Sequence, residues 1–280
     1  MIKARPITDH SRLSINTATT RAQWNLSQAI DGYARAGVGG ISPWRDQIAE
    51  MGLARAAKAI REAELTVTGV CRGGMFPWAT EQGRLDMLDD NRRAIEEAAT
   101  LDAQCLVLVV GGLPAGSKDL AGAHAMVEEA INTLLPEARA AGVKMAIEPL
   151  HPMYAADRAC VNTMRHALDI CDRAGEGIGV AVDVYHVWWD TELQNQIQRA
   201  GKERLLAFHV CDWLVPTRDL LMDRGMMGDG VIDIPLLRGW VEAAGYKGFH
   251  EVEIFSELDW WTRDPAEVIA VCKERSLTVV

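Results

Sequence analysis

The chain has 280 residues, 49% of them hydrophobic and 24% charged, a globular composition that excludes a disordered chain and suits one large core. The formal net charge of -10 and the lack of a basic cluster argue against nucleic-acid binding, because a phosphate backbone would be repelled. We expect a cytoplasmic protein with no membrane span, because no apolar stretch approaches the length of about 18 residues that a transmembrane helix needs.

Short runs rich in apolar and β-branched residues predict eight strands in chain order. They cover residues 13–17, 37–41, 65–70, 105–110, 143–148, 178–184, 205–210 and 250–255. Stretches with helical spacing of apolar residues lie between several of them, at residues 44–63, 85–101, 120–141, 162–174 and 235–244. Gly142, Gly175 and Gly245 each follow a helical run, where glycine can adopt the left-handed conformation that ends a helix.

The alternation of strands and helices predicts the fold class. Strand, helix and strand repeat at intervals of about 25 to 45 residues, as in the right-handed βαβ units that build a parallel sheet. Eight such units favour an α/β fold closed into a (β/α)8 TIM barrel, with one domain spanning residues 1–280. A doubly wound open sheet is the competing architecture. The six cysteines form no C-x-x-C pair and predict free thiols.

Potential metal ligands stand at the ends of the last four predicted strands. They are Glu148, Asp183, His209 and, on the eighth strand, Glu251 or Glu253. In a parallel barrel the catalytic residues gather at the carboxyl ends of the strands. A single strand-end carboxylate is more often a helix cap or an arginine partner. Four such groups in apolar strands need a shared partner, because unpaired buried charges are costly.

A divalent cation is the partner that suits these groups best. Three carboxylates and one imidazole favour Mn2+ or Mg2+, with Co2+ or Zn2+ as alternatives. Glu251 and Glu253 have the same parity along the strand, so alternation does not choose between them. We prefer Glu253 because it lies nearer the carboxyl end of the strand.

Four short motifs carry a family resemblance. They are EPLH beginning at Glu148, DVYH beginning at Asp183, FHVCD around His209 and EVEIF around Glu253. Together they resemble the xylose-isomerase-like TIM barrel superfamily of sugar isomerases and epimerases, over nearly the whole chain. The resemblance implies that strands five to eight supply these four residues to one metal ion, and that His186 contacts the substrate.

The chain also departs from part of that superfamily. Ketose 3-epimerases carry a second glutamate six residues beyond the ligand of strand five, and here that position is Tyr154. His151, three residues after Glu148, resembles a sub-branch that handles oxidised sugars and includes the α subunits of C-glycoside deglycosidases. The resemblance implies a sugar or keto-sugar glycoside as substrate, a homo-oligomer and, in that branch, a small β subunit.

The implied chemistry is enolisation of a keto-sugar. A cation at the barrel mouth can stabilise the enediolate that forms when a proton leaves the adjacent carbon. We expect His151, Glu148 or Glu253 to be the base, with a hydrogen bond across the loop as the other role for His151. Returning the proton gives an epimerase or an isomerase, whereas expelling a β leaving group from a 3-oxo glycoside gives a lyase.

Other residues could bind substrate in the predicted loops. Trp44 and Trp188 offer flat faces to a sugar, although core packing is equally expected. Arg158 and Arg218 could hold a hydroxyl, carboxylate or phosphate group, although surface salt bridges are the commoner role of arginine. The run GGLPAG at residues 111–116 lacks the end of a phosphate-binding loop and is discounted.

Two further functions compete with a sugar enzyme. The superfamily includes metal-dependent endonucleases for abasic DNA, which use more metals and ligands at earlier strand ends. Strands two to four here end without His or Glu, which argues against that activity. A non-catalytic sugar-binding subunit is the second alternative, and the intact ligand set argues against it.

Overall fold

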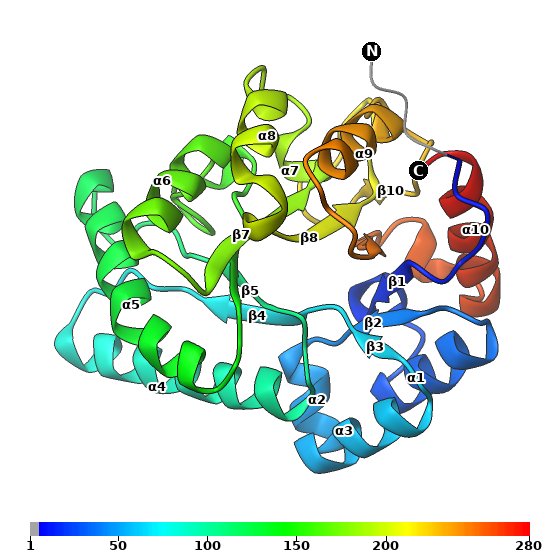
Figure 1. The fold of residues 1–280 in the computed structure, drawn as a ribbon, viewed down its shortest axis with the longest axis horizontal. Coiled ribbons are helices and arrows are strands. Elements are labelled where there is room, and N and C mark those ends of the chain that lie inside the picture. Colours follow the sequence, from blue (N-terminus) through cyan, green and yellow to red (C-terminus); the bar gives the residue numbers. More distant parts are fainter. Residues whose placement is uncertain (1–5) are drawn as a thin grey trace.

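The computed structural model describes residues 6–280 and shows a ring of parallel strands surrounded by helices (Figure 1). The barrel strands are β1 Leu13–Asn16, β2 Gly40–Ser42, β3 Thr66–Val67, β4 Val70–Gly74, β5 Leu106–Val109, β6 Met145–Ile147, β7 Ile178–Asp183, β8 Leu205–Val210 and β11 His250–Val252. Their order in the sheet is β3-β2-β1-β11-β8-β7-β6-β5-β4, and all the paired neighbours are parallel. β3 and β4 follow each other directly and share one barrel position, so the predicted (β/α)8 TIM barrel is confirmed.

The third barrel position differs from the predicted single strand at residues 65–70. β3 pairs with β2, whereas β4 pairs with β5 and continues to Gly74. The glycine at this end is required, because its φ is +108° and an added Cβ would lie 2.0 Å from the carbonyl oxygen of Val109. The close backbone approach explains why this strand end carries no side chain.

The helices lie outside the ring of strands (Figure 1). They are α1 Leu26–Arg35, α2 Arg45–Met51, α3 Leu53–Glu62, α4 Glu81–Thr100, α5 Leu120–Ala140, α6 Met164–Ala174, α7 Val184–Val187, α8 Leu193–Arg204, α9 Ile234–Ala243 and α10 Pro265–Thr278. Short 3-10 helices occupy η1 Thr17–Thr20, η2 Pro152–Tyr154 and η3 Trp260–Thr262, and β9 Asp212–Trp213 pairs antiparallel with β10 Arg224–Gly225. No helix within residues 6–280 is long and apolar enough to cross a membrane.

Local sequence signals explain the helix boundaries. Gly142, Gly175 and Gly245 have φ of +74°, +90° and +102° and close α5, α6 and α9, as predicted. The predicted helix at residues 44–63 is wrong as one element, because Gly52 at φ +88° divides it into α2 and α3. Asn25 caps α1 in a reciprocal pair of hydrogen bonds with Gln28, a start signal that the apolar pattern alone did not reveal.

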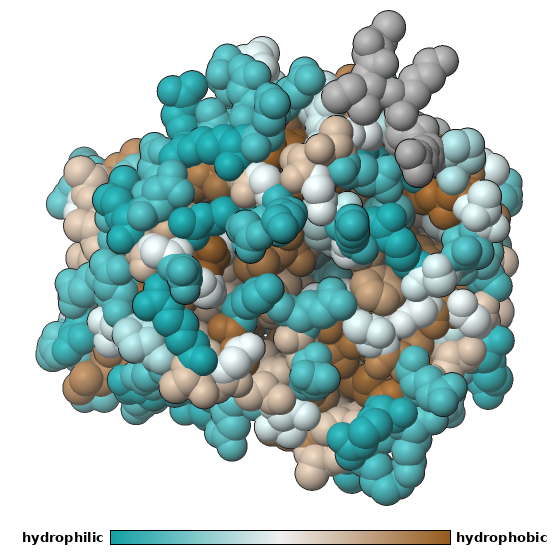
Figure 2. Space-filling model, viewed as in Figure 1, coloured by the Kyte–Doolittle hydropathy of each residue, from teal (hydrophilic) through white to brown (hydrophobic). Residues whose placement is uncertain are grey.

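The inside of the barrel contains a small cluster of small and medium side chains: Cys71, Cys105, Val107, Ala146, Ala181 and Ala207. A much larger cluster lies between the strands and the helices. All six cysteines are buried and free, which confirms the prediction of free thiols. On the face drawn in Figure 2, hydrophilic residues cover much of the rim and hydrophobic residues show between them.

Candidate metal centre

The alternation of the strands places the predicted ligands in one layer of the barrel. Side chains two residues apart on a strand point to the same side. Glu148, Asp183 and His209 each stand two residues after an interior alanine of their strand, Ala146, Ala181 and Ala207. Asp183 and His209 are also register partners in the sheet. The three side chains therefore point into the barrel, in the layer next to the interior alanines on the side of the carboxyl ends of the strands.

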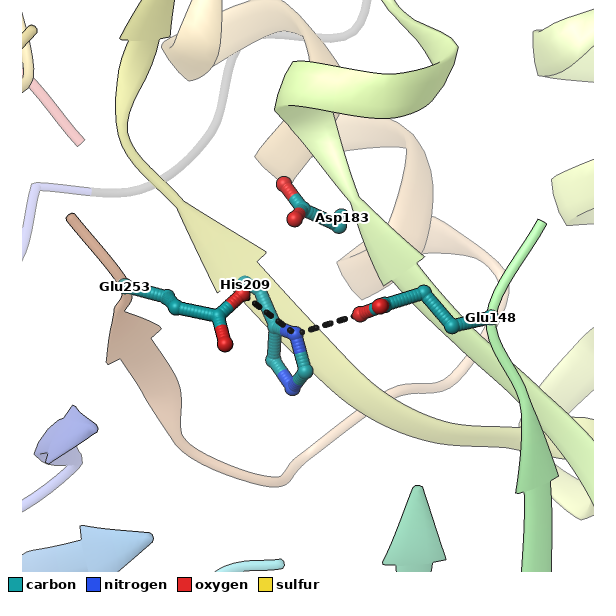
Figure 3. A group of neighbouring side chains, drawn as sticks. All are labelled: Glu148, Asp183, His209 and Glu253. Atoms are coloured by element: carbon teal, nitrogen blue, oxygen red, sulfur yellow. Dashed lines mark hydrogen bonds and ion pairs between the residues drawn. The ribbon is translucent and has the colours of Figure 1, made fainter. Parts of the chain in front are cut away.

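The four predicted ligands converge there (Figure 3). Glu148, Asp183, His209 and Glu253 each offer a ligand atom, and these atoms lie within 4.8 Å of one another. The Nδ1 atom of His209 is 2.9 Å from Oε1 of Glu148 and 3.8 Å from Oε2 of Glu253. All four residues are buried, and the Asp183 and His209 side chains are 0% exposed. The arrangement has the donor atoms of a metal site, and its side chains are shielded from solvent.

Glu251, the alternative ligand on the last strand, has a different place. It is the register partner of His209, and its Oε1 lies 3.6 Å from Nε2 of that histidine, on the far side of the ring from Glu148. Its oxygens accept hydrogen bonds from Asn16 at 2.9 Å and from the Thr68 hydroxyl at 2.7 Å. Because these contacts hold it beside the second ring nitrogen, Glu251 lies outside the group of four.

Arg224, from β10, was not among the sequence-predicted site residues, yet it forms ion pairs with two of the four candidate ligands. Its Nη1 donates to Oδ2 of Asp183 at 2.9 Å and to Oε2 of Glu253 at 3.2 Å. The guanidinium also stacks on Tyr185, 4.5 Å from the ring centre, and lies 5.3 Å from that of Phe255. The arginine therefore supplies a fixed positive charge between two of the candidate ligands. Only the tertiary fold brings it there, from β10.

The buried charges shift the pKa values of the ligands. Burial raises the pKa of Glu253 to about 8, and the nearby Glu148 and Asp183 add to that effect while Arg224 opposes it. Asp183 keeps a lowered pKa despite complete burial, because Arg224 and the histidines outweigh the desolvation. The surrounding carboxylates also hold the pKa of His209 well above its usual value, although burial opposes this. A bound cation would compete with these protons.

A cavity opens beside the four residues and holds about 420 Å³ of empty space, counting solvent at its mouth. Its walls include the predicted Glu148, Glu253, His186, Trp44 and Arg158, together with Tyr154, Arg72 and Arg224. The indole N–H of Trp44 donates to Asn16 at 2.8 Å, which fixes that ring at the wall.

His186 lies deep in the site. It is buried on α7, where Nε2 is 3.1 Å from Nη2 of Arg224 and 3.6 Å from Oδ2 of Asp183. Burial lowers the pKa of His186 to about 3, and Arg224 adds to that effect, so the ring is neutral at ordinary pH. A neutral imidazole at the wall can exchange hydrogen bonds with a sugar hydroxyl without adding charge.

Three other sequence-predicted residues lie apart from the cavity wall. The His151 ring packs on Trp213, with ring centres 4.9 Å apart, and its Nδ1 accepts the N–H of Met153 at 3.3 Å. Trp188 also packs against Trp213, at 5.8 Å. The Arg218 side chain is 51% exposed and bonds both oxygens of Asp223. None of these three side chains lines the cavity formed by residues 6–280.

The fold and the site together define a class of protein, a TIM barrel with a candidate metal centre at the carboxyl ends of its last four strands. The model of the family described as xylose isomerase-like TIM barrel matches residues 30–274. The chain belongs to this family. A search of curated proteins found no match.

Solved structures support the fold assignment. The crystal structure of protein SMc04130 from Sinorhizobium meliloti 1021 is 59% identical, with a TM-score of 0.94 over 96% of this chain and 98% of that one. The IolI protein with a bound zinc atom is 19% identical, with a TM-score of 0.83 over 96% and 98%. The 3-keto-D-glucoside 4-epimerase YcjR from E. coli is 19% identical, with a TM-score of 0.76 over 96% and 99%. The two likenesses at 19% identity show the fold alone.

Proposed function

We propose that this protein is a divalent-metal-dependent sugar isomerase or epimerase that enolises a keto-sugar. The observation that carries the proposal is the convergence of Glu148, Asp183, His209 and Glu253 within 4.8 Å, beside a cavity that Glu148 and Glu253 line. The zinc in the IolI structure and the epimerase activity named for YcjR, both on the same fold, are compatible with it.

The donor set fits a divalent cation. Three buried carboxylates and one imidazole suit Mn2+ or Mg2+, and Co2+ or Zn2+ also accept such ligands. A cation held there would polarise the carbonyl of a keto-sugar and stabilise the negative charge that develops on its oxygen. Nδ1 of His209 faces Glu148 and Glu253, so this nitrogen is the one we assign to the ion.

Glu251 and Asn16 have positioning roles in the proposed site. A histidine ligand usually donates its second N–H to a carboxylate that fixes the ring. Glu251 lies on that side of His209, with 3.6 Å between Oε1 and Nε2. The Asn16 amide donates to Glu251 at 2.9 Å and to Glu253 at 3.0 Å, which sets the direction of both carboxylates.

Proton transfer is assigned to the glutamates at the cavity wall. Glu148 and Glu253 both line the cavity, from β6 and β11 on either side of His209, so they can reach a bound sugar from two directions. His151 remains the alternative base. Its packing on Trp213 and its contact with Met153 favour the loop-stabilising role that the sequence also allowed.

A lyase acting on 3-oxo glycosides is the second candidate. It would use the same proton abstraction and then expel a β leaving group. The favouring observation is Tyr154, which lies at the cavity wall at the position where ketose 3-epimerases carry a second glutamate. Its hydroxyl donates to the carbonyl of Leu220 and burial raises its pKa, so it offers no carboxylate for a second proton transfer.

The test is a substrate screen with metal-loaded protein in D2O. Free ketoses, inososes and 3-oxo glycosides would be incubated with the Mg2+ protein and with the Mn2+ protein, and the products read by NMR or, for Mn2+, by mass spectrometry. We expect deuterium at a carbon next to a carbonyl, in a product that identifies the epimerase, isomerase or lyase. His151→Ala should keep the exchange, whereas Glu148→Gln should lose it. Absence of exchange with every substrate class would favour the non-catalytic alternative.

A further inference from the structure

Two arginines at the cavity wall have no acidic partner among residues 6–280. Arg72 belongs to β4, and Arg158 follows η2. Both side chains are half-buried, and among residues 6–280 neither guanidinium has a carboxylate within salt-bridge distance. The Nε atom of Arg72 is buried with no hydrogen-bond partner in the same part of the chain. A cation in this position is costly unless something that binds in the cavity compensates it.

The nearby groups do not supply that compensation. Asp90, the carboxylate that raises the pKa of Arg72, has both oxygens bonded by Arg45 at 2.9 and 3.1 Å. Arg158 lies over the face of the Tyr154 ring at 5.9 Å, a contact that orients the guanidinium without neutralising it. Burial lowers the pKa of Arg72, and the positive charge of Arg158 adds to that effect.

The carboxylates at the other part of the wall are already engaged. Glu253 accepts from Arg224 and Asn16, and Glu148 contacts His209. The cavity therefore has one region of carboxylates for a cation and a second region with two guanidinium groups that pair with no carboxylate in the described part of the chain. Guanidinium groups bind carboxylates and phosphates through paired, charge-assisted hydrogen bonds, which a neutral hydroxyl cannot match.

We propose that Arg72 and Arg158 bind an anionic group, a carboxylate or a phosphate, carried by the sugar that enters the cavity. The inference rests on the proposed function in taking a sugar as the substrate, and it narrows the substrate class to acidic sugars. The sugar would place its carbonyl toward the candidate metal ligands and its anionic group between the two arginines.

The experiment compares three probes by titration calorimetry on the metal-loaded protein: D-fructose, D-fructuronate and D-fructose 6-phosphate. The variants are Arg72→Gln and Arg158→Gln, and the matched control is Arg92→Gln, whose guanidinium is bonded to Glu137 away from the cavity wall. We expect at least one anionic probe to bind about tenfold or more tightly than D-fructose, since a charge-assisted pair supplies that much. The better of the two anionic probes identifies the group as a carboxylate or a phosphate.

Each cavity variant should reduce this preference about tenfold, and the control should keep it. Thermal unfolding checks that the variants fold, and their melting temperatures should equal or exceed that of the parent chain because each loses an uncompensated charge. Equal affinity for all three probes, or a preference that survives in both cavity variants, would overturn the inference. Failure of the proposed function would show separately, as absence of metal or of deuterium exchange.

Discussion

The two halves of the barrel mouth have opposite chemistry. The ligand half, at the ends of β6, β7, β8 and β11, presents Glu148, Asp183, His209 and Glu253. The donor half, at the ends of β1 to β5, presents Asn16 and Thr68, which donate hydrogen bonds to the acids, and the guanidinium of Arg72. The difference teaches that acidic groups gather where they can share one cation, while the opposite strands orient those acids and leave space for an anionic or hydroxyl-rich molecule.

The largest expected effect is a loss of stability when the buried positive charge of the ligand half is removed. Arg224→Met removes the buried partner of Asp183 and Glu253, so the metal-free protein should lose about 3–5 kcal/mol of unfolding free energy, as when one member of a buried pair is removed. Arg92→Met is the control, because its ion pairs with Asp89 and Glu137 are exposed, and such a pair contributes about 0–1 kcal/mol. Chemical denaturation measures both. Equal, small effects would contradict the central place given to Arg224.

A smaller effect should follow from a change behind the ligands. Glu251→Gln keeps the size of the side chain but removes the negative charge that lies 3.6 Å from the second nitrogen of His209. Metal affinity should fall about 10- to 100-fold, the usual cost of an outer contact to a ligand. A competition titration with a metal-sensitive dye measures this, with Glu257→Gln on the surface as the control. Complete loss of metal binding would instead indicate that Glu251 is a direct ligand and that Glu253 is the residue that positions His209.

The smallest expected effect is a pH dependence of the same affinity. Burial and the neighbouring carboxylates raise the pKa of Glu253 to about 8, so a cation must displace its proton at lower pH. Metal affinity should therefore fall by at least about tenfold for each pH unit below 8, because the raised pKa of His209 adds a second proton that the cation must displace, and the Glu253→Gln variant should have a flatter profile. If the metal affinity of the parent protein did not change from pH 6 to pH 8, Glu253 would not be a protonated ligand in this range.

The same pKa shift predicts the stability of the metal-free protein. The folded-state pKa of Glu253 lies above its ordinary value of 4.5, so its contribution is fully present below pH 4.5 and is lost as the pH rises through 8. Urea denaturation of the metal-free protein across this range should show the loss, and added metal should reverse it at pH 8.

Much of this structure could be predicted from the sequence, for physical reasons. Apolar strands that end in Glu148, Asp183 and His209 reveal both the barrel and its mouth, because burial pattern and strand polarity are local properties. The division of residues 44–63 into two helices depended on one glycine, Gly52, that an apolar pattern tolerates. The break between β3 and β4 depended on pairing with different neighbours.

Arg224 and Arg72 were beyond such reasoning. Nothing local distinguishes a buried arginine that bridges Asp183 and Glu253 from the many surface arginines of this chain. Arg218, six residues earlier, is a predicted substrate-binding residue, and its half-exposed side chain is bonded to the buried Asp223. Charge balance between distant strands is a property of the assembled barrel, and only the tertiary contacts reveal it.

The most direct test of the central claim is the metal content of purified, reconstituted protein. After chelation and reloading with Mn2+ and removal of excess ion, mass spectrometry of the elements should give about one ion per chain for the parent protein. His209→Ala should give close to none, and Arg218→Ala should equal the parent, because one contributes to the group of four and the other lies on the surface. A parent protein that holds no ion, or a His209→Ala variant that holds a full equivalent, would contradict the metal centre.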